Sequence, residues 1–195
     1  MSSISALANI HSKGQYGDYE GKNENNLLKI YEKKNLLIVQ IVQYKNSTVL
    51  FEEFDIDGLK LNNEPLNVIN NNDTRILWNG PKNWILVSTK KGLIKDISEK
   101  FIESDFAVTD LSHSRAIFEI EGKNAKEVLK KGCPFNFNIL EKNNSINSTY
   151  NGITFTLDIL DNNPNKIRLF ALRSFGESFY HSITDAALEY GYIGV

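Results

Sequence analysis

The sequence is poor in residues that form disulfides or bind metals. Its 195 residues include one cysteine, three histidines and one methionine. A single cysteine cannot form a disulfide within the chain, and three scattered histidines beside one thiol give no metal-ligand spacing. No apolar segment approaches the roughly 20 residues needed to span a bilayer. The first residues also lack the basic start and apolar run of a secretory signal, so we expect a cytoplasmic protein.

The chain also lacks an excess of charge and a phosphate-binding loop. Its formal net charge is −2, which is too small to attract a polyanion, so a nucleic-acid role has no electrostatic support. The glycines of Gly80-Pro81 and Gly122 stand alone and belong to no glycine-rich nucleotide motif. With 41% hydrophobic and 24% charged residues, the composition is that of an ordinary globular protein.

The apolar periodicity predicts an α+β fold. Strands are expected at 36–42, 75–78, 84–88, 106–111, 116–120, 153–160 and 167–172, and helices at 93–102, 125–129 and 176–190. Strands 75–78 and 84–88 flank a glycine-proline turn of five residues and predict a hairpin. This order favours antiparallel sheets with helices packed on one side, arranged as two related halves of strand–strand–helix units.

The chain is predicted to form one α+β domain over residues 31–195, preceded by an arm. Residues 1–30 are rich in Ser, Gly, Asn and charge, so they predict either disorder or an extended arm that becomes ordered on another protein. Residues 59–74 turn polar and rich in asparagine, and we expect a loop there.

Cys133 is expected to be a packing residue. It follows Gly132, which ends the predicted helix, and it precedes Pro134. A helix C-terminus disfavours a thiolate, and Lys130 and Lys131 are the obvious compensation. A thiol enzyme that uses Cys133 and His113 remains the alternative hypothesis.

A local hydrolase triad is also disfavoured. Asp110, Ser112 and His113 supply the three residue types, but in an extended segment the histidine points away from the other two. Arg115 and Arg173 lie at strand ends, where a cation is usually solvated. The aromatic residues Trp78, Trp84, Phe175 and Phe179 are interpreted as core residues.

Several short motifs in order resemble the gamma subunit of heterotetrameric sarcosine oxidase. They are Gly80-Pro81-Lys82-Asn83-Trp84-Ile85-Leu86, Asp110-Leu111-Ser112-His113-Ser114-Arg115, Gly122 with Ala125, Val128 and Leu129, Lys131-Gly132-Cys133-Pro134-Phe135-Asn136, and Arg173-Ser174-Phe175. The resemblance covers residues 75–191, and before that Ser5-Ala6-Leu7 is similar. Phe135 and Asn136 depart from the leucine and aspartate of that family. The helix after Gly122 also resembles one in the folate-binding T-protein, which implies a related fold.

The resemblance implies a structural subunit without catalytic, cofactor-binding or metal-binding residues of its own. FAD, FMN, NAD, zinc and tetrahydrofolate would belong to partners, the alpha, beta and delta subunits of a complex that demethylates sarcosine oxidatively. Gly80, Pro81, Trp84, Gly122, Gly132, Cys133 and Pro134 would then be structural, and Ser5, Leu7, His113, Arg115 and Arg173 would contact partners. A free-standing folate-binding module and the third subunit of an N-methylglutamate dehydrogenase remain alternatives.

Overall fold

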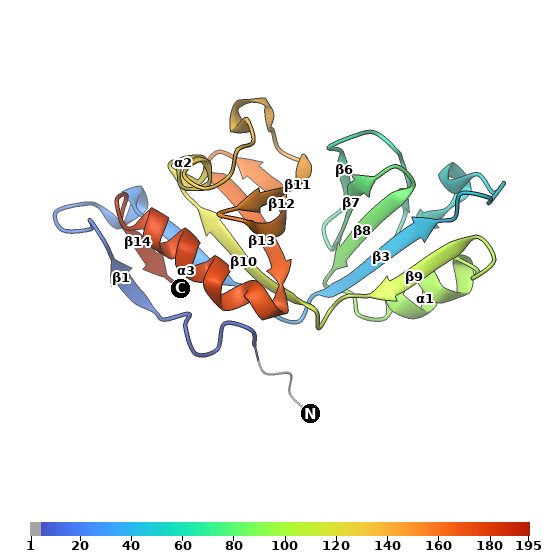
Figure 1. Cartoon of the computed structure of the whole chain (residues 1–195), viewed down its shortest axis with the longest axis horizontal. Coiled ribbons are helices and arrows are strands. Elements are labelled where there is room, and N and C mark those ends of the chain that lie inside the picture. Colours follow the sequence, from blue (N-terminus) through green and yellow to red (C-terminus); the bar gives the residue numbers. More distant parts are fainter. Residues whose placement is uncertain (1–4) are drawn as a thin grey trace. The chain divides into compact units, whose positions relative to one another are not determined.

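The chain forms two compact units in the computed structural model, which describes residues 5–195 (Figure 1). Unit 1 comprises residues 5–34, 114–142 and 147–195, and unit 2 comprises residues 35–113 and 143–146. Most of unit 2 is therefore inserted in unit 1 between residues 34 and 114. Residue 30, where we predicted the end of an arm, lies inside a strand of unit 1.

A seven-stranded sheet forms the centre of unit 1. Its order is β1 (Gly14–Tyr16), β14 (Tyr192–Gly194), β2 (Leu28–Glu32), β10 (Arg115–Glu121), β13 (Asn165–Leu172), β12 (Ile153–Asn162) and β11 (Ser145–Tyr150). β14 and β2 pair in parallel, whereas β1–β14, β2–β10, β10–β13 and β12–β13 are antiparallel. Most of this sheet therefore has the predicted antiparallel pairing.

Two helices cover one face of this sheet, α2 (Ala125–Lys130) and α3 (Gly176–Ala187) (Figure 1). Phe118 on β10 contacts two aromatic rings of α3, with ring centroids 5.4 Å from Phe179 and 5.3 Å from Tyr180. Burying one such aromatic ring stabilises a fold by about 1.5–3 kcal/mol. The predicted packing of helices on one side of a sheet is confirmed in unit 1.

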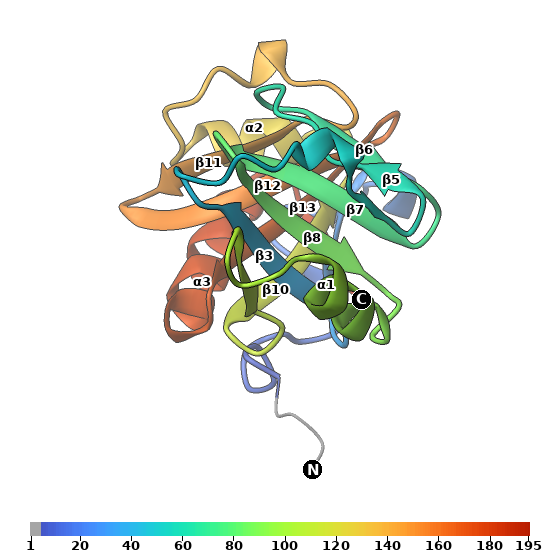
Figure 2. The same cartoon turned by 90° about the vertical axis from the view of Figure 1, so that its right-hand side faces the viewer.

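A five-stranded antiparallel sheet forms unit 2. Its order is β6 (Val68–Asn70), β7 (Thr74–Gly80), β8 (Asn83–Ser88), β3 (Leu37–Gln43) and β9 (Phe106–Asp110). Figure 2 shows β7, β8 and β3 side by side. The helix α1 (Leu93–Lys100) buries Leu93 and Ile97, and the ring of Phe101 packs against that of Phe106 at 4.9 Å.

The predicted α+β class with antiparallel sheets is confirmed, but some local predictions were wrong. The turn between β7 and β8 has two residues, Pro81 and Lys82, because Asn79 and Gly80 continue β7 through a bulge. The two strands predicted at 106–111 and 116–120 are present as β9 and β10, and they belong to different sheets. The polar stretch 59–74 contains β5 (Leu59–Lys60) and β6, which pair locally with neighbouring strands.

Asp57 anchors the small hairpin of β4 (Asp55–Ile56) and β5 to the rest of unit 2. Its Oδ1 lies 2.8 Å from Lys90 Nζ, and its Oδ2 accepts hydrogen bonds from Thr74 Oγ1 at 2.7 Å and Asn71 Nδ2 at 3.1 Å. Hydrogen bonds from Lys90, then Thr74 and Asn71, lower the pKa of Asp57 to about 2 because they favour the ionised carboxylate.

Unit 2 should therefore lose stability as the pH falls from about 5 to 2. The contribution of Asp57 is complete above the unfolded-state pKa of about 3.9 and disappears as the pH falls through the folded value of about 2. Asp57→Asn should remove this part of the acid dependence, and Asp96→Asn, at an exposed carboxylate of α1, should leave it intact. Trp78 and Trp84 both lie in unit 2, so tryptophan fluorescence during urea unfolding reports the effect. If the free energy of unfolding of unit 2 falls equally with pH in the wild type and in Asp57→Asn, the prediction is contradicted.

Candidate partner-contact surface

A corner of unit 1 presents exposed apolar and cationic side chains where β13 leads into α3. The short helix η4 (Arg173–Phe175) makes this turn. Leu172 and Phe175 are 44% and 50% exposed, and their spacing of three residues places them on one side of the turn. Arg173 is exposed between them, and Arg115 is the register partner of Leu172 in the β10–β13 pair. We call Arg115, Leu172, Arg173 and Phe175 the η4 corner.

Arg115 is a half-buried cation in this corner. Its Nη1 donates to the carbonyl oxygen of Ser114 at 3.4 Å and to the hydroxyl oxygen of Ser114 at 3.1 Å. Within residues 5–195 no carboxylate lies at ion-pair distance from it. Burial lowers the pKa of the Arg115 guanidinium because desolvation disfavours its charge. Such a group favours the approach of a carboxylate from another molecule.

Ser5 and Leu7 lie near the start of α3, but Leu7 is a core residue. Its side chain is fully buried, and a methyl group added at Gly176 would lie 3.8 Å from Leu7 Cδ2 and 2.6 Å from Ala116 Cβ. Ser5 is half-buried, and its hydroxyl accepts a hydrogen bond from the backbone N–H of Leu7 at 3.0 Å. The predicted partner contact of Leu7 therefore does not fit its position, because the side chain is buried in the interior of unit 1.

His113 is exposed and does not form a triad with its neighbours. Asp110 Oδ1 accepts a hydrogen bond from the backbone N–H of Ser112 at 2.8 Å, and Ser112 Oγ accepts one from the N–H of Ile38 at 3.0 Å. Both groups thus serve the backbone of unit 2, and in residues 5–195 neither bonds to His113. The turn that carries His113 leads directly to Ser114 and Arg115, so its partner contact stays a prediction.

Cys133 lies in a packed environment at the end of α2. The thiol is 5% exposed and donates to Ser148 Oγ at 3.2 Å. The two lysines that could favour a thiolate are engaged elsewhere, Lys130 with Glu127 and Lys131 with Glu189, each at 2.6 Å. This geometry fits the packing role that we predicted for the cysteine.

Iodoacetamide should modify Cys133 in the folded chain about a hundredfold more slowly than it modifies free cysteine, because a buried thiol reacts only when its surroundings open. Mass spectrometry of timed samples gives the rate, and the same reaction in urea provides the control. A rate in the folded chain equal to that of free cysteine would contradict the packing role, and only a faster rate would support the thiol-enzyme hypothesis.

A charged network that the sequence did not predict lies on the sheet of unit 1. Glu119 on β10 is buried, and its Oε1 accepts a hydrogen bond from Arg168 Nε at 2.9 Å. Its Oε2 lies 3.3 Å from Lys33 Nζ and 3.8 Å from Lys166 Nζ, and Lys166 also pairs with Glu121 at 2.7 Å. Glu119 therefore contacts three cations and shares one of them, Lys166, with Glu121, which is an arrangement typical of a structural ion-pair network.

Trp84, Gly122 and Gly132, which we predicted to be structural, lie at packed or turn positions. Trp84 is buried in unit 2, and its indole N–H donates to the carbonyl oxygen of Asn62. Gly122 has a φ of 139°, and a methyl group at Gly132 would lie 2.7 Å from the ring of Tyr150. In the described residues no group of three or more histidine, cysteine, aspartate or glutamate side chains could hold a metal. No described helix is long and apolar enough to cross a membrane.

The comparisons with solved structures define the fold. The chain has the fold of a glycine cleavage system aminomethyltransferase T from Bartonella henselae, with a TM-score of 0.61 and 12% identity. The match covers 88% of this chain and 49% of that one, so this chain spans about half of its length.

The chain also matches a chain of the heterotetrameric sarcosine oxidase from Corynebacterium sp. U-96, whose structure was determined in complex with pyrrole 2-carboxylate. The TM-score is 0.82 at 22% identity, and the match covers 96% of this chain and 95% of that one. No family model matches the sequence, and no curated protein matches it. Because both identities are low, the two structures establish only the fold. It is the fold that the motifs predicted.

Proposed function

We propose that this chain is the gamma subunit, a non-catalytic structural subunit, of a cytoplasmic flavoprotein complex of the heterotetrameric sarcosine oxidase type. The observation that carries the proposal is the match to a chain of such an enzyme over almost the full length of both chains. A match that covers 96% of this chain and 95% of that one supports an equivalent place in an equivalent assembly.

The complex would demethylate sarcosine oxidatively to glycine and form hydrogen peroxide. The one-carbon unit would pass to tetrahydrofolate or leave as formaldehyde. FAD, FMN, NAD, zinc and tetrahydrofolate would bind to the alpha, beta and delta subunits. The contribution of this chain is to hold those subunits in place.

The η4 corner supplies a surface suited to that role. Interface cores are typically built around a few apolar or arginine anchors within a polar rim. Leu172 and Phe175 are exposed apolar anchors, and Arg115 is a half-buried cation suited to a carboxylate on the partner. We propose that a catalytic subunit covers these three residues.

A free-standing folate-binding module is the second candidate, and the likeness to aminomethyltransferase T favours it. Titration of the isolated chain with tetrahydrofolate separates the two candidates. Saturable binding would favour the module. The third subunit of an N-methylglutamate dehydrogenase-type complex would share the structural role proposed here and differ in the substrate of its partners.

Reconstitution from separately purified subunits tests the proposed function. The isolated chain should be colourless and should not oxidise sarcosine, whereas its addition to the other three subunits should restore a stable complex with sarcosine-dependent peroxide formation. Turnover by the isolated chain would overturn the proposal. An equally stable and active complex formed without this chain would overturn it as well.

A further inference from the structure

The strand β9 is an open edge of the sheet in unit 2. It pairs with β3 on one side, and in the described chain no strand pairs with its other side. Tyr44 N–H donates to the Asp105 carbonyl, and Leu111 N–H donates to the Ile38 carbonyl. Because backbone groups alternate in an antiparallel pair, those of residues 107 and 109 face β3, and those of Val108 and Asp110 point outward.

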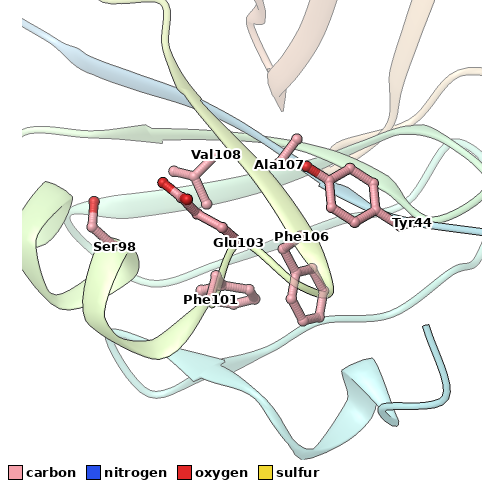
Figure 3. A pocket seen from close by; sticks show the side chains of 7 residues that line it. All are labelled: Tyr44, Ser98, Phe101, Glu103, Phe106, Ala107 and Val108. Carbon is pink, nitrogen blue, oxygen red and sulfur yellow. The ribbon is translucent and has the colours of Figure 1, made fainter. Parts of the chain in front are cut away.

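A cavity of about 390 Å³ runs along this edge (Figure 3). In Figure 3, Phe101, Phe106 and Val108 lie on one side of the β9 ribbon, and Tyr44 and Ala107 lie on the other. Side chains from both faces of the strand thus line a hollow beside unpaired backbone groups, and its accessible surface is mostly polar, with apolar patches at Ala107 and Val108. An added strand would need both features, hydrogen-bonding groups and a recess for one of its side chains.

The segment that supplies most of the cavity lining is acidic overall. The stretch from α1 to the end of β9 carries five carboxylates, those of Asp96, Glu99, Glu103, Asp105 and Asp110, and Glu103 lines the cavity. The same stretch has two cations, Lys95 and Lys100, and Lys100 pairs with Asp55 at 3.0 Å, so carboxylates outnumber lysines. The net negative charge of this stretch therefore complements a basic segment of another chain.

We propose that β9 is a docking edge for an extended, basic segment of another protein chain. The segment adds as a sixth strand through the backbone groups of Val108 and Asp110. It places an apolar side chain in the cavity and a lysine or arginine beside Glu103. This site belongs to unit 2 and uses none of the η4 corner, so it does not depend on the proposed function.

Amide exchange on the full-length ¹⁵N-labelled chain tests this directly. The probe is a blocked peptide of alternating lysine and valine, and its matched control carries N-methyl groups on alternate backbone amides. At saturation, the Val108 and Asp110 amides should exchange about tenfold more slowly, whereas Ala107 and Thr109 should change little because β3 already protects them. Unchanged exchange at Val108 and Asp110 with millimolar peptide, or equal binding of the N-methylated control, would overturn the proposal.

Two charge variants test the same site without disturbing the core. Glu103→Lys should weaken binding of the lysine–valine peptide about threefold or more, because it replaces an attraction by a repulsion. Glu52→Lys makes the same charge change at an exposed position of unit 2 outside the cavity, and it should leave binding unchanged. Equal affinities for the two variants would contradict the proposed placement of the peptide.

Discussion

Replacing Leu172 and Phe175 together with aspartate should abolish assembly with the partner subunits. Both side chains are about half exposed, so the isolated chain should keep its fold and its unfolding transition. In the complex, the same two carboxylates would be buried against an apolar surface without counter-ions. Loss of two interface anchors at about 2 kcal/mol each weakens binding on the order of a thousandfold.

A matched variant makes this test specific to the η4 corner. Ile139 is 57% exposed in another part of unit 1, so Ile139→Asp introduces the same kind of charge at a similarly exposed apolar residue. Size-exclusion chromatography of each variant with the other subunits gives the comparison. The proposal for the corner fails if the double variant assembles normally, or if Ile139→Asp disrupts assembly to the same extent.

Glu119→Gln should lower the free energy of unfolding of unit 1 by about 3 kcal/mol. The substitution keeps the shape of the side chain but removes the carboxylate that lies 2.8 Å from Arg168 Nη2, and Arg168 is mostly buried. Lys33 and Lys166 are each about one-third exposed and can turn toward water. Breaking a buried ion pair from one side typically costs about 3–5 kcal/mol, and the mobility of the lysines places the expected effect at the lower end.

Glu127→Gln is the control for this prediction. Glu127 forms an exposed pair with Lys130 one turn along α2, and the loss of such a pair costs about 0.5 kcal/mol or less. Both tryptophans lie in unit 2, so exchange of the β10 and β13 amides reports unit 1 better than fluorescence does. Equal losses for the two variants would show that the Glu119 network does not stabilise the sheet.

The local elements of this fold were predictable because their signals lie within a few residues. The apolar run 36–42 became β3, and the helical spacing of Ala125, Val128 and Leu129 became α2. The sequence did not indicate β1 or β14, which have three residues each and pair with each other across almost the whole chain. The inserted unit 2 was missed for the same reason, since β2 and β10 pair across more than 80 residues.

The charged and exposed residues of the site were harder to predict. Glu119 and Arg168 are register partners on separate strands, and no local pattern gives that register. Phe175 was interpreted as a core residue, but it is exposed because η4 turns it outward before α3 begins. The motifs led us to predict Arg115 and Arg173 as contact residues, which stays a prediction, and the structure places the exposed Leu172 and Phe175 beside them.

The most direct test of the central claim is gentle purification of the tagged chain from its native host, with a visible spectrum recorded beside a denaturing gel. We expect three co-purifying chains at equal stoichiometry and a flavin absorbance that bleaches when sarcosine is added. A lone, colourless chain recovered in high yield would contradict the subunit proposal and leave the likeness to sarcosine oxidase as one of fold.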